Sequence, residues 1–276
     1  MPGLRPWFVL LGLSLLAGSQ ACAAATQTPS AEDPFPQVAQ SYLVELDGQR
    51  IWHRNTAQRL APASLTKLMT ALLVSEQLTP EALVEVDSAA ARETGSKLGL
   101  RTGETLRMHD LLAATLIASA NDACRALADQ VAGTEAAFVQ RMNQRAKEMG
   151  LRNTRYVNAC GHDAPGHYAS AEDLRVLAVA VMKIPLLATM VAQEQMQIAS
   201  RNTQRTFMLA NKNALIGRYE GTVGIKTGTT PLAGKCLVAL VRRGTHSVLL
   251  VLLKGKDRWW DAVDILDIAF ARASAS

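Results

Sequence analysis

The sequence has no run of lysine and arginine with interleaved aromatic residues, although its formal charge is +5 over 276 residues. The basic residues are spread along the chain, so we expect no nucleic-acid partner. The chain also lacks internal repeats. Its composition, 49% hydrophobic and 19% charged, is neither that of a disordered chain nor that of a collagen. Its length suits one large domain or two small ones, and its mild positive charge favours anionic substrates.

No apolar stretch at the N-terminus reaches the roughly 20 residues that a membrane span requires. The run from Trp7 to Ala17 has 11 residues. With Arg5 before it and Ala21-Cys22-Ala23 after it, residues 1–25 are typical of a secretory signal peptide. Polar residues before Cys22 disfavour lipidation there. We therefore expect an exported protein, periplasmic or extracellular, with no membrane span in the mature form.

Only three cysteines remain after this cleavage: Cys124, Cys160 and Cys236. Export makes a disulfide possible, and an odd number leaves at least one thiol unpaired within the chain. We expect most of them to be buried thiols that pack as small hydrophobic groups. None has metal-ligand spacing, and we expect neither a metal nor another cofactor.

Strand patterns lie near both ends of the chain, and helical patterns lie between them. Residues 26–37 are predicted to be a flexible lead-in, and residues 38–276 a single domain. Strands are predicted at 41–46, 50–53, 83–86, 221–229, 236–241 and 247–253. Helices are predicted at 62–76, 108–118, 123–132, 135–149, 170–182 and 259–273. We expect the two ends of the chain to form one sheet, with a helical insertion between them.

The first chemical motif is a serine and a lysine in the predicted helix 62–76. Ser64 and Lys67 are three residues apart, so they share one helical face. A serine hydroxyl is a weak nucleophile, and a lysine kept neutral by burial can take its proton. Taken alone, the stretch also fits a chance pair on a solvated helix face.

Two further motifs follow along the chain. Ser119-Ala120-Asn121 ends a predicted helix, 55 residues after Ser64, and Lys226-Thr227-Gly228-Thr229 closes a predicted strand 107 residues later. In this order the three motifs resemble those of the low-molecular-mass penicillin-binding proteins, the D-alanyl-D-alanine carboxypeptidase family of serine DD-peptidases. The resemblance extends from about Gln40 to the last helix.

The resemblance implies both a fold and a set of catalytic roles. The fold would be α+β and β-lactamase-like: an antiparallel sheet with flanking helices and a mainly helical inserted subdomain. Ser64 would form an acyl-enzyme after Lys67 removes its proton, and Ser119 with Lys226 would relay a proton to the leaving amine. The backbone N–H groups of Ser64 and Thr229 would stabilise the oxyanion.

Substrate binding is likewise implied by the resemblance. Asn121 would hold the substrate amide. Thr227, Gly228 and Thr229 would bind the terminal carboxylate together with Arg258, whose guanidinium geometry suits carboxylates. Lys212 is a second cationic candidate. The implied partners are peptidoglycan stem peptides and, as acylating inhibitors, β-lactam antibiotics.

Other functions remain open at this point. A DD-endopeptidase that cuts peptidoglycan cross-links would share all three motifs. A β-lactamase would need a deacylating glutamate, and Glu135 and Glu148 stand in the wrong sequence context. A non-catalytic cell-wall binder would be expected to have lost at least one motif.

Several conspicuous residues are predicted to be structural. His162, Asp163 and His167 fit neither a zinc pattern nor a need of serine–lysine chemistry. Trp259 and Trp260 are expected to be packing anchors. Cys160 departs from the residue that relatives usually carry in that segment.

Overall fold

The computed structural model describes Gly3 and residues 33–274. The predicted signal peptide, residues 1–25, lies outside the described residues apart from Gly3. At the end of the predicted lead-in, Asp33 accepts a hydrogen bond from Tyr42 and the ring of Phe35 packs edge-on against Trp52. Residues 33–37 therefore contact the folded domain.

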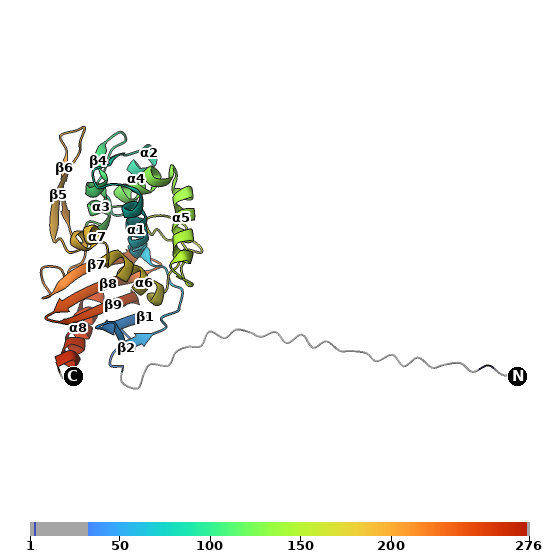
Figure 1. Cartoon of the computed structure of the whole chain (residues 1–276), viewed down its shortest axis with the longest axis vertical. Helices are drawn as coiled ribbons and strands as arrows, with labels where there is room; N and C mark the ends of the chain where they lie inside the picture. The colour runs from blue at the N-terminus through green and yellow to red at the C-terminus, as the bar shows by residue number, and fades with distance from the viewer. Residues whose placement is uncertain (1–2, 4–32, 275–276) are drawn as a thin grey trace.

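A five-stranded antiparallel sheet forms the base of the molecule (Figure 1). Its order is β2-β1-β9-β8-β7, with β1 Ala39–Leu46, β2 Gln49–Arg54, β7 Thr222–Thr230, β8 Gly234–Arg243 and β9 His246–Gly255. The β1–β2 hairpin turns at Asp47-Gly48, both in the left-handed region, as the sequence predicts. β1 pairs with β9 over a long sequence separation, with Leu43 opposite Val251. The prediction that both ends of the chain build one sheet is confirmed.

Helices cover both faces of this sheet. The last helix, α8 Arg258–Ser274, packs its apolar stripe on one face, in a core that includes Ile265 and Leu250. The other face packs against α6, Ala171–Met182, and belongs to a larger core that continues into the helical part. Burial of these apolar faces is the main favourable contribution to folding. The expected α+β fold with flanking helices is confirmed.

The helical insertion stands above the sheet in Figure 1. Its main helices are α1 Lys67–Gln77, α3 Met108–Leu116, α4 Asn121–Ala132 and α5 Glu135–Glu148. Side-chain caps start two helices: Thr134 accepts from the Ala137 N–H, and Ser170, where the sequence predicts a helix start, accepts from the Asp173 N–H. Smaller elements complete it: α2 Ser88–Ala91 and α7 Pro185–Val191, with a β-hairpin of β3 Leu83–Glu85 and β4 Thr105–Arg107.

One hairpin was not predicted from the sequence. β5 Gln195–Ala199 and β6 Thr206–Ala210 pair with each other and stand beside the helical part (Figure 1). Their outward faces are mostly exposed, and Met208 is among the most exposed apolar side chains of the described chain. A strand pair with so little buried surface gives a weak sequence pattern, because strand preference depends on packing.

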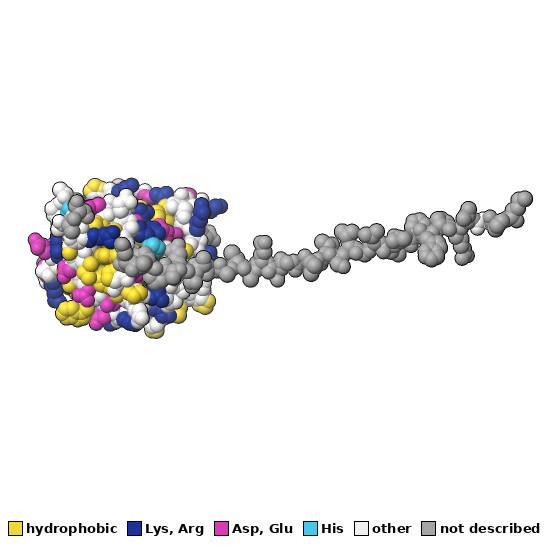
Figure 2. Space-filling view, turned by 90° about the horizontal axis from the view of Figure 1, so that it is seen from below, with side chains coloured by type: hydrophobic (Ala, Val, Ile, Leu, Met, Phe, Trp, Pro, Cys, Tyr) yellow, Lys and Arg dark blue, Asp and Glu magenta, His cyan; other side chains and the backbone are white. Residues whose placement is uncertain are grey.

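In the described part of the chain, no single helix is both long and apolar enough to cross a membrane. The pair α6 and α7 passes on length and composition only when joined, across a bend of 107°. Seen from below, charges of both signs are interleaved around a hydrophobic patch (Figure 2). Trp259 packs near the sheet, but Trp260 is 71% exposed, so the expectation that Trp260 anchors the packing is wrong.

Candidate active site

Ser64 and Lys67 meet at the entrance of α1. The predicted helix begins with a short 3₁₀ turn, Ala63–Thr66, and becomes α-helical at Lys67. Lys67 Nζ lies 3.1 Å from Ser64 Oγ. The serine is partly exposed, whereas the lysine is fully buried. The predicted Ser–Lys pair therefore forms, with an accessible hydroxyl and a sequestered amine.

The surroundings of Lys67 lower its pKa enough for the free base to be well populated at neutral pH. Burial lowers the pKa of Lys67 to about 7, against an opposing pull from the Glu93 carboxylate. Nζ also lies 2.7 Å from Asn121 Oδ1 and 2.5 Å from the backbone carbonyl of Cys160. These acceptors fix the position of the amine next to Ser64. A neutral amine in this position can take the hydroxyl proton.

Ser119 and Lys226 form a second pair on the other side of the site. Lys226 Nζ donates to Ser119 Oγ over 2.9 Å, and both side chains are buried. Burial lowers the pKa of Lys226 well below its ordinary value, and the charges of Lys67, Arg258 and Lys212 lower it further. The structure thus brings together two sequence motifs that are 107 residues apart.

Two backbone positions at the site lie in the left-handed region although neither is glycine. Ala63, just before Ser64, has φ of 50°, and Ser119 has φ of 60°. Such conformations cost about 1–3 kcal/mol each and persist only where the surroundings impose them. Both residues bear directly on the orientation of a reactive hydroxyl.

Asn121 is held by the protein at both ends of its amide. Its Oδ1 accepts from Lys67, and its Nδ2 donates to the carbonyl of Thr94 over 2.5 Å. Its backbone N–H donates to the carbonyl of Ser96 over 2.7 Å. The contacts found for this side chain are therefore with the lysine and with the segment before β4.

The strand β7 lies at the edge of the sheet and brings the third motif to Ser64. A Cβ atom on Gly228 would lie 2.9 Å from the Ala63 Cβ and 3.1 Å from the Ser64 nitrogen, so only glycine allows this approach. Thr229 follows on the strand and is exposed. Backbone N–H groups in the first turn of a helix have no acceptor within it, and Ser64 lies in such a turn.

Arg258 reaches this strand from the start of α8. Its Nη1 donates to Thr229 Oγ1 and to the Gly228 carbonyl, each over 2.8 Å, and its guanidinium lies over the ring of Trp259. The structure therefore places the guanidinium of Arg258 beside the third motif. Lys212, which follows β6, lies close enough for its charge to affect Lys226.

The other conspicuous residues of the sequence, among them His167, Glu135 and Glu148, have partners outside the two Ser–Lys pairs. His167 is buried, lies 2.9 Å from Thr66 Oγ1 and has a pKa lowered by burial to about 4, so it is neutral. Asp163 accepts from Thr230 Oγ1 and from the Leu232 N–H. Glu135 accepts from the Ala159 N–H, and Glu148 pairs with Arg145.

A disulfide corrects the prediction about the cysteines. Cys124 on α4 is bonded to Cys160, across 36 residues, and only Cys236 is a free, buried cysteine among the described residues. Export and the cysteine count allowed this bond, but no spacing rule identifies the partners. Glu93 was also missed, because no local pattern marks a carboxylate whose role depends on its distance from Lys67.

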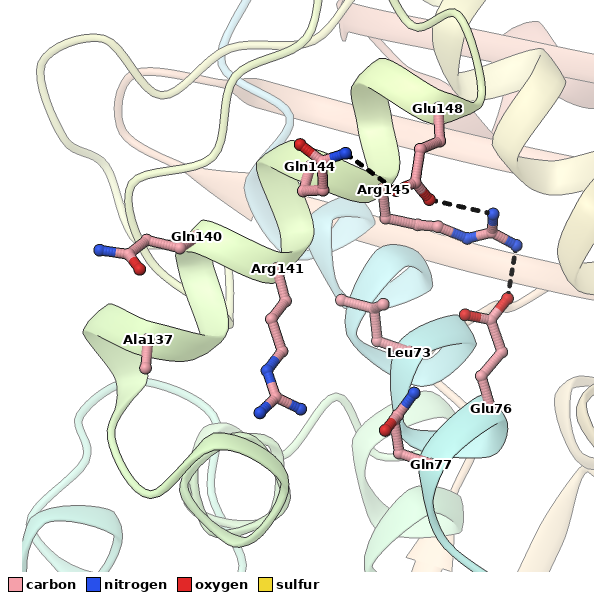
Figure 3. Close-up of a pocket in the computed structure, with 9 residues that line it drawn as sticks. All are labelled: Leu73, Glu76, Gln77, Ala137, Gln140, Arg141, Gln144, Arg145 and Glu148. Atoms are coloured by element: carbon pink, nitrogen blue, oxygen red, sulfur yellow. Dashed lines mark hydrogen bonds and ion pairs between the residues drawn. The ribbon is translucent and has the colours of Figure 1, made fainter.

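One groove lies away from these residues, between α1 and α5 (Figure 3). It has a volume of about 800 Å³ and carries the ion pairs of Arg145 with Glu76 and Glu148. Its α1 residues begin at Leu73, in the second half of the helix that Lys67 opens. None of the predicted site residues lines it.

Comparisons with known proteins agree with this geometry. The profile of the peptidase S11 family, described as D-alanyl-D-alanine carboxypeptidase, matches residues 27–257. The D-alanyl-D-alanine carboxypeptidase DacF of Bacillus subtilis is 33% identical over 96% of this chain and 70% of its own length. A D-alanyl-D-alanine endopeptidase of Pseudomonas aeruginosa is 35% identical over 75% of this chain and 67% of its own.

A solved structure extends the similarity to three dimensions. The Streptomyces K15 DD-transpeptidase matches with a TM-score of 0.80 at 27% identity, covering 87% of this chain and 99% of that one. The motifs, the fold and the family profile lead to one conclusion: this chain belongs to the D-alanyl-D-alanine carboxypeptidase family of serine peptidases.

Proposed function

We propose that this protein is an exported serine D-Ala-D-Ala carboxypeptidase that removes the terminal D-alanine from peptidoglycan stem peptides. The observation that carries this proposal is the pairing of Lys67 with Ser64 and of Lys226 with Ser119 around one partly exposed hydroxyl. Membership of the family supports the reaction class. The predicted signal peptide supports action on the cell wall.

The reaction begins with attack by Ser64 Oγ on the carbonyl before the terminal residue, while Lys67 takes the hydroxyl proton. The backbone N–H groups of Ser64 and Thr229 stabilise the oxyanion, a contribution of several kcal/mol in comparable sites. The C–N bond then breaks, and Ser119 with Lys226 delivers a proton to the leaving amine. Water hydrolyses the acyl-enzyme and regenerates Ser64.

The terminal carboxylate is assigned to Thr229 and Arg258, with Thr227 and Gly228 shaping that end of β7. Arg258 already contacts Thr229 Oγ1, and the arginine fork suits two carboxylate oxygens. Lys212 adds positive charge near Lys226. Asn121 is assigned to the substrate amide, for which it would have to exchange one of its present hydrogen bonds.

An endopeptidase is the alternative within the family, since a curated relative carries that name. The contact of Arg258 with Thr229 suits a free carboxylate beside the scissile bond, as a terminal D-alanine provides. A β-lactamase is disfavoured by Glu135 and Glu148, whose contacts with Ala159 and Arg145 leave no glutamate of that segment to activate water. A β-lactam is therefore expected to acylate Ser64 and to leave slowly.

The test uses a pentapeptide ending in D-Ala-D-Ala, a cross-linked peptide dimer and a fluorescent penicillin. The wild type should release D-alanine and become labelled, and Ser64→Ala should do neither. An enzyme that splits only the dimer would be an endopeptidase. A protein inert in all three assays would refute the proposal.

A further inference from the structure

Lys67 is held between two segments from different parts of the chain. Its amine contacts Asn121 at the start of α4 and the carbonyl of Cys160 in the connection between α5 and α6. Within residues 149–170 this connection has no helix or strand, only two isolated bridges: Arg155 with Tyr168 inside it, and Ala169 with Leu60. A carbonyl on such a connection needs other contacts to remain within hydrogen-bond distance of the amine.

The Cys124–Cys160 disulfide joins these same two segments. Cys124 lies one turn after Asn121 on α4, and Cys160 is the residue whose carbonyl contacts Lys67. Both cysteines are buried, and Cys160 Sγ lies 3.7 Å from the backbone oxygen of Asn121. The covalent bond thus connects the two acceptors of the lysine by a short path.

A side-chain contact repeats this connection closer to solvent. His162 Nε2, two residues after Cys160, lies 2.8 Å from Glu93 Oε2. The next residue, Thr94, accepts from the Asn121 side chain. The contact between His162 and Glu93 therefore links the segment of Cys160 to the segment that holds Asn121. It lies nearer the surface than the disulfide does.

The packing of the connection explains why its position matters. A Cβ atom on Gly161 would lie 2.0 Å from the Ala63 carbonyl oxygen, so the connection presses directly on the turn that carries Ser64. A small shift at Cys160 would therefore displace the lysine acceptor and the turn of the nucleophile together. Misplacement by about 1 Å can cost about 100-fold in rate.

We propose that the Cys124–Cys160 disulfide is a positioning element of the acylation site, which holds the Cys160 carbonyl and Asn121 in place around Lys67. The inference rests on the function proposed above. A disulfide also stabilises a fold by restricting the unfolded chain. A purely stabilising cross-link would leave the acylation rate of the folded enzyme unchanged, whereas a positioning one would not.

The experiment compares the oxidised wild type with Cys124→Ala/Cys160→Ala and with Ile265→Ala. Ile265 is fully buried between α8 and the far face of the sheet, so its truncation lowers stability without touching the site. Acylation by a fluorescent penicillin is measured well below every unfolding temperature. We expect a loss of about 10- to 100-fold for the cysteine pair and less than about twofold for Ile265→Ala.

A second readout does not depend on activity. The ¹³Cε resonances of labelled lysines, assigned with Lys67→Arg, report the titration of Lys67 directly. Removal of the disulfide should admit water to the amine and raise its pKa, because burial is what depresses it. Ile265→Ala should leave this titration unchanged.

Each outcome decides the question. The proposal would be overturned if the double variant Cys124→Ala/Cys160→Ala were acylated at the wild-type rate and its Lys67 titrated as in the wild type. If the wild type itself is not acylated, the proposed function fails, and the lysine titration alone then supports or overturns the positioning role. Cys124→Val/Cys160→Ala, which fills more of the buried space, replaces the first pair if that pair does not fold.

Discussion

The rate at which Ser64 is acylated should rise with pH and level off just above neutrality. In the proposed mechanism the reacting form contains neutral Lys67, whose pKa burial lowers to about 7 from an ordinary 10.5. With that pKa about half of the lysine is neutral at pH 7 and about 1% at pH 5, which is a change of about 50-fold. Above pH 8 nearly all of the lysine is neutral, so the rate there should be only about twofold higher than at pH 7.

The plateau is the informative part of this profile. A lysine with an ordinary pKa would keep gaining about tenfold per pH unit up to about pH 10. The depression from 10.5 to about 7 corresponds to about 5 kcal/mol against the charged form in the folded protein. This cost falls on the folded state and is fully present below pH 7, so the same burial that activates the lysine opposes folding at low pH.

Stopped-flow acylation by a fluorescent penicillin from pH 5 to pH 10 measures the profile, with circular dichroism showing that the fold persists at each pH. Because imidazole groups also titrate near neutrality, His162→Asn removes the imidazole that contacts Glu93, and a rising limb should remain in this variant. Lys67→Arg should abolish acylation at every pH, and with it the rise of the rate toward neutral pH. A rate still rising tenfold per unit between pH 8 and pH 10 would refute the reasoning.

Three further substitutions test the packing and the substrate contacts. Gly161→Ala should cost about 3 kcal/mol or more in urea unfolding, because the added Cβ would lie 2.0 Å from the Ala63 carbonyl oxygen and φ is +91°. Asp122→Ala should cost about 3 kcal/mol, since the buried carboxylate accepts four backbone N–H groups from residues 98–100 and 123. Arg258→Lys should raise KM for the pentapeptide by about tenfold with little change in kcat, because lysine lacks the fork that contacts Thr229.

Matched controls separate the causes. Gly103→Ala has a similar φ of +81° but open space around the added Cβ, so it should cost far less than Gly161→Ala. If Gly103→Ala and Gly161→Ala lost the same stability, the positive φ would explain the loss and the contact with the Ala63 carbonyl would not. Asp122→Asn keeps one side-chain oxygen and should therefore lose less stability than Asp122→Ala. Equal losses of stability in the two variants would mean that hydrogen bonds accepted by this side chain do not stabilise the fold. Arg218→Lys, an exposed change, should leave KM unaltered.

Those parts of the fold with strong local patterns could be predicted from the sequence. The apolar strands at both ends, the turn at Asp47-Gly48 and the helix start at Ser170 were all identified, because local sequence determines them. The proximity of Ser119 to Lys226 was predicted as well, but through family resemblance. Ser119 and Lys226 are 107 residues apart, and sequence spacing alone does not predict that their side chains lie 2.9 Å from each other.

The features that escaped prediction depend on tertiary approach. The Cys124–Cys160 bond requires α4 and the irregular connection after α5 to meet. The exposure of Trp260 depends on how α8 turns its faces against the sheet, since Trp259 beside it packs inward. Composition and periodicity do not determine such choices, because each is settled by packing against distant residues.

The pairing of β1 with β9 has a consequence for the order of folding. A chain is synthesised from its N-terminus, so the first strand must wait for a partner about 200 residues later, with Leu43 opposite Val251. Ser64 and Lys67 are thus made early, whereas Lys226 and the edge strand arrive near the end. Such long-range pairing slows folding. It also means that an incomplete chain contains Ser64 and Lys67 without the strand that carries Lys226.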